Sequence, residues 1–124
     1  MNFEIEKTEK YAIVKSKVEK LDTTVAPELK AEFVLLDKSG FRNLIIDLNE
    51  TRYCDSSGLS ALLVANRLTK AANGTLVITG LQGSVEKLIT ISQLHTVLNI
   101  VPSIEEAIDF VFMEEVERDL DSEQ

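Results

Sequence analysis

The sequence predicts an α/β protein: a mixed, mostly parallel sheet of four to five strands that begins with an antiparallel hairpin and is covered by about four helices. Two observations support this fold class. Strand-like apolar runs alternate with segments of helical periodicity, which requires crossover connections and therefore parallel strands. The first two strand-like segments are separated only by residues 8–10, which is short enough for a hairpin. The length of 124 residues suits one domain with its own core.

Local patterns define the first elements. Alternation of apolar and charged residues over 3–7 predicts a strand, and the apolar run at 11–14 predicts its antiparallel partner. Thr23 and Thr24 are candidates for capping a first helix, because their hydroxyls can accept hydrogen bonds from free helix amides. Pro27 suits the first helical turn. The helix then continues through apolar residues at helical spacing and ends at a glycine: Leu29, Phe33, Leu36 and Gly40.

The middle of the chain contains two runs, 44–48 and 75–79, that are apolar at nearly every position. Continuous apolar character predicts strands that are covered on both faces. Between them we expect a helix from about Ser57 to Gly74. Two further helices are predicted after the second run, one opening at Ser84 and one at Pro102-Ser103.

The formal charge of the chain is −8 at pH 7, and much of it lies at the end. Residues 114–124 contain six acids and one arginine and show little apolar periodicity, so we expect an acidic, disordered tail after a domain that spans 3–113. Without this tail the formal charge is −3. No cluster of lysines and arginines is present, so we expect no direct contact with nucleic acid, whose phosphates would be repelled.

The location of the protein is predicted from its cysteine and its hydropathy. The single cysteine, Cys54, cannot form an internal disulfide and suits a reducing compartment. No apolar stretch approaches the roughly 18 residues needed to span a membrane. The first residues are charged and alternating, unlike a signal peptide. We therefore expect a cytoplasmic protein without membrane insertion.

Catalytic chemistry is not expected. The only histidine, His95, lies about forty residues from Ser56, and a Ser-His-acid triad needs the two within hydrogen-bond reach. One histidine and one cysteine do not make a metal site of soft ligands. Neither common glycine-rich phosphate loop is present. We expect no catalytic residue, no metal and no cofactor, and hence a protein that is not an enzyme.

The motif Asp55-Ser56-Ser57-Gly58 lies where a polar loop ends and a helix begins. A helix N-terminus has free amides and the positive end of the helix dipole, so it stabilises negative charge. Asp55 or a serine there can cap the helix by accepting a hydrogen bond from a free amide, and a serine can also act as a nucleophile or carry a phosphate. Loops at the carboxyl ends of parallel strands are also where α/β folds place their sites.

This motif and its surroundings resemble the STAS domain family, and within it the anti-sigma factor antagonists of bacterial partner-switching systems. Residues 43–49, followed by 54–59 with the Asp-Ser-Ser-Gly motif, are similar to the family signature. Further similarities lie at Leu21-Asp22 before the first helix, at 71–76 between helix and strand, and at 85–88 and 92–94.

The resemblance implies a phospho-switch that acts in signal transduction and transcription regulation. The first serine of the motif, Ser56, would be phosphorylated by an anti-sigma factor serine kinase. The unphosphorylated protein would bind this kinase and free its sigma factor, and phosphorylation would block the binding. A serine phosphatase is a further candidate partner. The partner-binding surface would include Asp22, Asp55, Ser56, Ser57 and Gly58.

Alternatives remain for single residues and for the whole function. Asp22 could instead cap the first helix, and Ser57 could stabilise the first turn of its own helix. A stand-alone STAS domain could also be a subunit of a lipid-transport ABC system that binds the ATPase without phospho-switching, or part of a larger assembly resembling a stressosome. The family usually has a glycine where this chain has Glu19.

Overall fold

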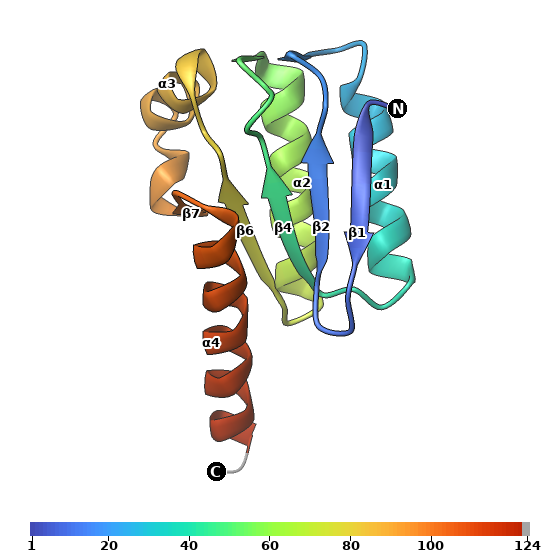
Figure 1. Cartoon of the computed structure of the whole chain (residues 1–124), viewed down its shortest axis with the longest axis vertical. Helices are drawn as coiled ribbons and strands as arrows, with labels where there is room; N and C mark the ends of the chain where they lie inside the picture. Colours follow the sequence, from blue (N-terminus) through green and yellow to red (C-terminus); the bar gives the residue numbers. More distant parts are fainter. Residues whose placement is uncertain (123–124) are drawn as a thin grey trace.

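The computed structural model describes residues 1–122 and confirms the predicted α/β class. Figure 1 shows a five-stranded sheet in the order β1-β2-β4-β6-β7, and β3 and β5 form a separate two-stranded sheet. The strands are β1 (Phe3–Lys7), β2 (Ala12–Ser16), β3 (Lys20–Leu21), β4 (Asn43–Asp47), β5 (Tyr53–Cys54), β6 (Thr75–Thr79) and β7 (Asn99–Val101). The helices are α1 (Ala26–Lys38), α2 (Ser56–Ala71), α3 (Gly83–Ile91), the 3-10 helix η1 (Leu94–Thr96) and α4 (Ile104–Ser122).

The strand pairing confirms the mixed sheet. β1 and β2 form the predicted antiparallel hairpin, with Phe3 opposite Ser16 and Lys7 opposite Ala12. All other neighbours in the sheet are parallel: β2 with β4, β4 with β6 and β6 with β7. The carboxyl ends of these parallel strands therefore meet at one end of the molecule, the upper end in Figure 1.

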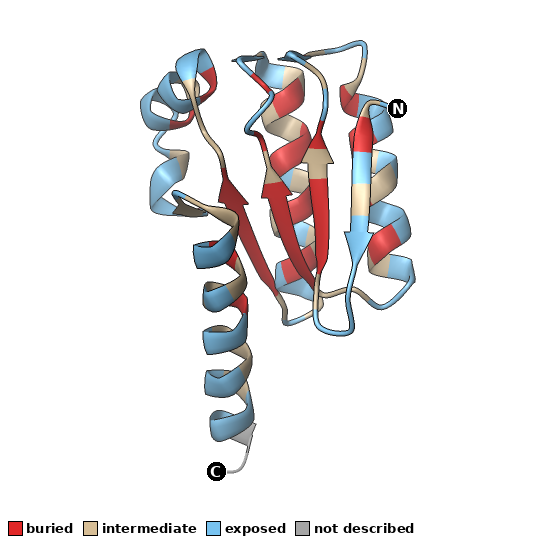
Figure 2. Cartoon of the chain, viewed as in Figure 1, coloured by how far each residue is buried: buried red, intermediate tan, exposed pale blue. Residues whose placement is uncertain are grey.

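Helices cover both faces of the sheet, as β4 illustrates. Its side chains alternate between the faces, so Leu44 and Ile46 join the core cluster that includes Leu62 of α2. Ile45 points the other way, into the smaller cluster that includes Val111 of α4. Figure 2 shows the central strands as mostly buried. The predicted burial of this strand on both faces is confirmed.

The start of α1 differs from the prediction. The N-cap residue is Val25, and no side chain caps the helix. Thr24 is engaged with Asp22 instead: its backbone N–H and its hydroxyl donate to Asp22 Oδ1 at 3.0 and 2.6 Å. The prediction that Thr23 or Thr24 caps α1 is therefore wrong, because the carboxylate of Asp22 organises the turn before the helix.

The end of α4 also differs from the prediction. Residues 114–122, expected to be disordered, continue the last helix without interruption, while 123–124 lie outside the described residues. A polar cluster explains this extension. Arg42 donates two hydrogen bonds to the carboxylate of Glu115, at 2.8 and 3.3 Å, and Arg118 lies 3.2 Å from the same group. The side-chain amide of Asn43 donates to Glu115 and also to the carbonyl of Lys10, at 3.0 Å in the second case.

Arg118 ties α4 to the first residues of two strands. Its Nη1 donates to the hydroxyl of Thr75 at 2.9 Å, and its Nη2 donates to Asn43 Oδ1 at 3.1 Å. Burial alone would raise the pKa of Glu115, but the hydrogen bonds from Asn43, Arg42 and Arg118 outweigh it and hold this pKa at about 2. The charged form of Glu115 therefore stabilises the folded state at neutral pH.

Substitution Glu115→Gln tests this cluster. At neutral pH we expect the free energy of unfolding to fall by about 1.5–3 kcal/mol, because two arginines lose a charged hydrogen-bond acceptor. The folded pKa is about 2, below the ordinary value of 4.5, so the contribution is present above pH 4.5 and is lost as the pH falls towards 2. Urea unfolding at several pH values measures it. The difference between the wild type and Glu115→Gln should shrink over that window, and Glu114→Gln is the matched control. A difference that stays constant down to about pH 2 would contradict the account.

Candidate functional site

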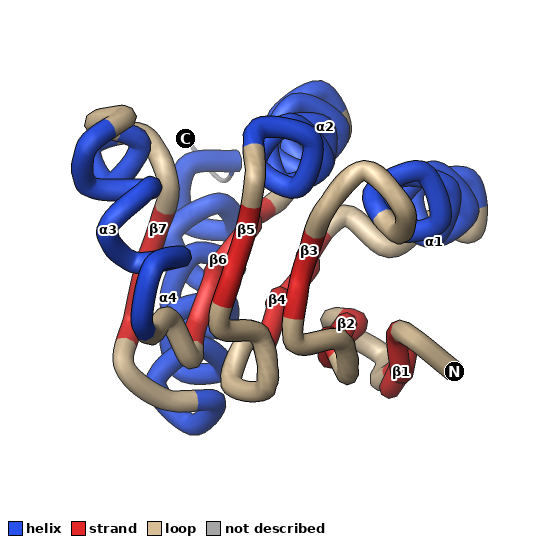
Figure 3. Tube along the Cα trace, turned by 90° about the horizontal axis from the view of Figure 1, so that it is seen from above, coloured by secondary structure: helices blue, strands red, loops and turns tan. Residues whose placement is uncertain are grey.

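The Asp55-Ser56-Ser57-Gly58 motif lies at the start of α2, directly after β5. β5 pairs in parallel with β3, so that Leu21 lies opposite Cys54. The backbone N–H of Asp55 donates to the carbonyl of Leu21 at 3.2 Å and extends this pairing by one residue. Figure 3 looks down on this end of the molecule and shows β3 beside β5, next to the starts of α1 and α2. A strand pair of two residues each leaves no periodic signal, which is why neither strand was predicted from the sequence.

Asp55 caps α2, as predicted. Its Oδ1 accepts hydrogen bonds from the backbone N–H groups of Ser57 and Gly58, at 2.9 and 3.0 Å. Its own carbonyl accepts the first helical hydrogen bond, from Leu59 at 3.0 Å. The carboxylate therefore satisfies two free amides and also lies at the positive end of the helix dipole.

Gly58 allows the first turn of α2 to lie against β3. A Cβ at this position would be 2.3 Å from the carbonyl oxygen of Leu21 and 2.7 Å from the Sγ of Cys54. The neighbouring oxygen belongs to the backbone of a paired strand, so it cannot move away without breaking that pairing. A glycine is needed here because of close approach.

The two serines of the motif differ in their surroundings. Ser57 is half-buried, and its hydroxyl lies 3.1 Å from the hydroxyl of Thr23, which in turn donates to Asp55 Oδ2 at 3.4 Å. Ser57 thus links α2 to the loop before α1. Ser56 is exposed, and its side chain makes no hydrogen bond to any residue between 1 and 122.

Asp22 belongs to the same end of the molecule. Both residues next to it in the chain contact the motif. Leu21 contacts Asp55 and Gly58, and Thr23 contacts Asp55 and Ser57. The hydrogen bonds from the hydroxyl and the backbone of Thr24 lower the pKa of Asp22 below its ordinary value of 3.8. Asp22 is therefore charged at neutral pH. It stabilises the turn before α1, although it is not the helix N-cap.

Part of the polar loop before the motif has a structural role. Thr51 is buried, donates to the carbonyl of Val18 at 2.7 Å and shares a hydrogen bond with the hydroxyl of Ser16. The carbonyl of Glu19 accepts from the backbone N–H groups of Arg52 and Tyr53, at 2.8 and 3.1 Å. The side chain of Glu19 itself is exposed, so at this position only the backbone holds the loop.

The other side chains that could take part in a reaction or bind a metal ion do not form a site with Ser56. Burial, and then the nearby charge of Asp55, raises the pKa of the Cys54 thiol to about 11, so it is not a thiolate at neutral pH. His95 is exposed on η1 and lines a separate cavity of about 770 Å³ beside α3 and β7. Within residues 1–122, no three His, Cys, Asp or Glu side chains are grouped as a metal ion would need.

Comparison with known proteins identifies the family. The family model for the STAS domain matches residues 2–107. The chain belongs to the STAS domain family. In the residues that the structure describes, no helix of this STAS protein is both long enough and apolar enough to cross a membrane.

Solved structures share the STAS fold at low sequence identity. An anti-sigma factor antagonist from Mycobacterium paratuberculosis is 18% identical, with 88% of this chain and 92% of that chain covered and a TM-score of 0.79. The phosphorylated form of SpoIIAA, a Bacillus cell fate determinant, is 22% identical, with coverages of 88% and 98% and a TM-score of 0.70. A variant of RsbS from Moorella thermoacetica is 18% identical, with coverages of 95% and 99% and a TM-score of 0.73.

Substitution Gly58→Ala tests the close approach of α2 to β3. In a free helix, alanine would be more stable than glycine by about 1 kcal/mol. Here we expect a net loss of about 1–3 kcal/mol, because the added methyl group collides with the carbonyl of Leu21. Urea unfolding measures the change, and Ser60→Ala, two residues further along α2, is the control. If Gly58→Ala were as stable as the wild type, the proposed collision would not exist.

Two substitutions at Asp55 separate capping from charge. Asp55→Ala removes the acceptor for Ser57 and Gly58 and should lower the free energy of unfolding by about 0.5–2 kcal/mol. Asp55→Asn keeps an acceptor oxygen and should remain within about 0.5 kcal/mol of the wild type. Thermal unfolding of the two variants checks this, and equal losses in both would argue against the cap.

Proposed function

We propose that this STAS protein is an anti-sigma factor antagonist whose switch residue is Ser56. The unphosphorylated form binds an anti-sigma factor serine kinase and frees the sigma factor, and phosphorylation of Ser56 blocks this binding. The observation that carries the proposal is the contrast between the serines: the Ser56 hydroxyl is exposed and unbonded within the described residues, whereas Ser57 is half-buried and bonded to Thr23.

The position of Ser56 suits a modification that leaves the fold intact. Its hydroxyl can be esterified without the loss of an internal hydrogen bond, and it lies on the first residue of α2. The positive end of a helix dipole tolerates a phosphate, which carries about −1.5 to −2 charges at pH 7. Asp55 continues to cap the helix, because its bonds use the amides of Ser57 and Gly58.

The same position explains why a phosphate would release a partner. It would add charge next to Asp55, at an end of the molecule where Asp22 is charged as well. A partner that covered this end would have to remove water from all three groups, which is costly for charges without counterions. The partner-binding surface in this proposal comprises Asp22, Asp55, Ser56, Ser57 and Gly58.

The proposal describes a regulator without a catalytic reaction of its own. It acts as a phosphoprotein in bacterial signal transduction, and a serine phosphatase restores the binding form. The family and its solved members support this role, since anti-sigma factor antagonists share the fold and SpoIIAA has been solved in a phosphorylated form.

Incubation with candidate serine kinases and ATP, followed by mass spectrometry, tests the switch. We expect one phosphate on Ser56, none on the Ser56→Ala variant, and normal phosphorylation of the Ser57→Ala control. Ser56→Ala should bind the kinase as tightly as the wild type, whereas Ser56→Asp should bind at least about tenfold more weakly, a difference of about 1.4 kcal/mol.

Two results would overturn the proposal. Phosphate on Ser57 alone, or on no residue of the motif, would remove Ser56 as the switch. Equal affinity of Ser56→Ala and Ser56→Asp for the kinase would show that charge at this position does not control binding. If the wild type, Ser56→Ala and Ser56→Asp all copurified equally with a transport ATPase, that result would instead support the lipid-transport alternative.

A further inference from the structure

The second half of α4 has an exposed apolar stripe at the other end of the molecule. Four apolar side chains that are 45–64% exposed share one side of the helix: Phe112, Met113, Val116 and Leu120. Helical geometry places residues three and four positions apart on one face, so these four form a continuous strip. A shallow hollow of about 220 Å³, lined by Phe112, Met113, Val116 and Glu117, lies on it.

This stripe is held on an ordered helix. On the inner side of α4, Glu115 and Arg118 are fixed to Arg42, Asn43 and Thr75. At its upper end the ring of Phe112 meets the ring of Tyr11 edge-on, with 6.2 Å between centroids. A partner would therefore meet a surface that is already formed, which lowers the entropy cost of binding.

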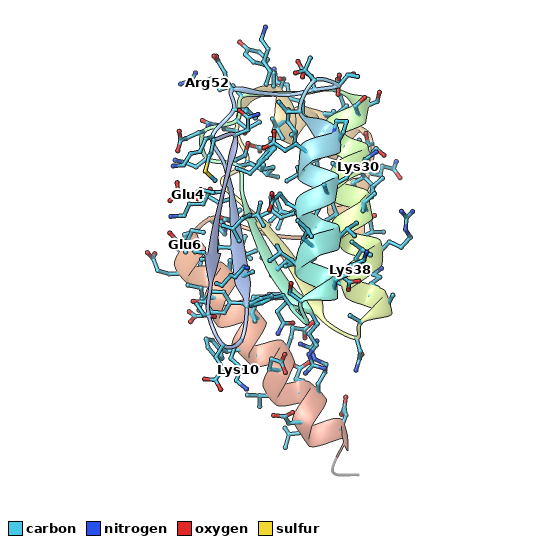
Figure 4. All side chains as sticks on the ribbon, turned by 90° about the vertical axis from the view of Figure 1, so that its right-hand side faces the viewer. Glu4, Glu6, Lys10, Lys30, Lys38 and Arg52 are labelled. Atoms are coloured by element: carbon cyan, nitrogen blue, oxygen red, sulfur yellow. The ribbon has the colours of Figure 1, made fainter. Side chains whose placement is uncertain are left out.

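The stripe is far from the proposed switch. Figure 1 shows α4 extending past the amino ends of the parallel strands, away from the start of α2. Figure 4 shows Arg52, three residues before Asp55, near one end of the molecule and Lys10, whose carbonyl binds Asn43, beyond the opposite ends of the strands, where α4 continues past it. Both surfaces could be occupied at once.

The charge of α4 restricts what can cover the stripe. The helix contains eight acids and one base, Arg118, and this base is directed at Thr75 and Asn43. Asp109 and Glu117 flank the stripe, and both are exposed. A second copy paired through α4 would bring a helix of net charge −7 against another of net charge −7. A partner that covers this acidic surface therefore needs positive charge.

We infer that the Phe112–Leu120 face of α4 is a docking site for a basic amphipathic helix of another protein. The partner's apolar residues, spaced three and four apart, would cover Met113, Val116 and Leu120. Its lysines or arginines would lie beside Asp109 and Glu117. This contact does not depend on Ser56 or its phosphorylation, and it would bring a second protein to the STAS domain while the switch end stays free.

Titration of the ¹⁵N-labelled chain with a synthetic lysine–leucine peptide tests the inference. The peptide is 18 residues long, with leucines at helical spacing, and a scrambled peptide of the same composition lacks the apolar face. We expect amide shifts concentrated at residues 109–121 and affinity at least tenfold higher for the patterned peptide. The double substitution Met113→Ser and Val116→Ser should weaken binding at least tenfold. Ile91→Ser, an exposed apolar residue on α3, should not, and neither should Ser56→Ala.

Other outcomes would overturn the inference. Shifts spread over all acidic surfaces, or equal binding of both peptides, would show only charge attraction. Sedimentation that reveals a dimer of the wild type, lost in the Met113→Ser and Val116→Ser variant, would make a second copy the occupant. Because no kinase is present, either failure leaves the proposal for Ser56 standing.

Discussion

The first turn of α2 lies directly against the carbonyl of Leu21, and the rest of the upper end depends on this contact. It requires a glycine at 58, since a Cβ there would be 2.3 Å from the carbonyl oxygen. The pairing of β3 with β5 fixes the same two segments. Together they bring the turn of Asp22 beside the motif, with the side chain of Ser56 exposed.

Most features set by neighbours in sequence could be predicted, and features set by distant contacts could not. The buried strands follow from continuous apolar runs, and the cap of α2 from an acid before a helical pattern. The start of α1 was mispredicted although its contacts are local: Thr24 donates to Asp22, two residues before it, and does not cap the helix. The sequence does not show which of these neighbouring polar side chains organises the turn. Residues 114–122 are helical because Glu115 meets Arg42, 73 residues away, and an acidic stretch alone gives no sign of that partner.

The candidate site was predicted in composition but not in detail. Asp55, Ser56 and Gly58 were singled out from one motif, and each has different surroundings in the structure. Asp55 caps α2, Gly58 lies against the carbonyl of Leu21, and Ser56 is exposed. Ser57 was expected to stabilise its own helical turn, yet its hydroxyl is bonded across to Thr23. That bond depends on the loop between β3 and α1, whose course the sequence does not define. The separate ends of the molecule, one with the serine and one with the stripe of α4, likewise emerge only from the fold.

The central claim is that a phosphate on Ser56 changes the surface charge and not the fold. Comparison of ¹⁵N–¹H NMR spectra of the chain with serine and with phosphoserine incorporated at position 56 tests it without any kinase. The account predicts amide shifts confined to the turn around Asp22 and the first turn of α2, with the core of the sheet and α4 unchanged. Shifts that extend through β4, β6 and α4 would contradict it, because the phosphate would then act by rearranging the structure.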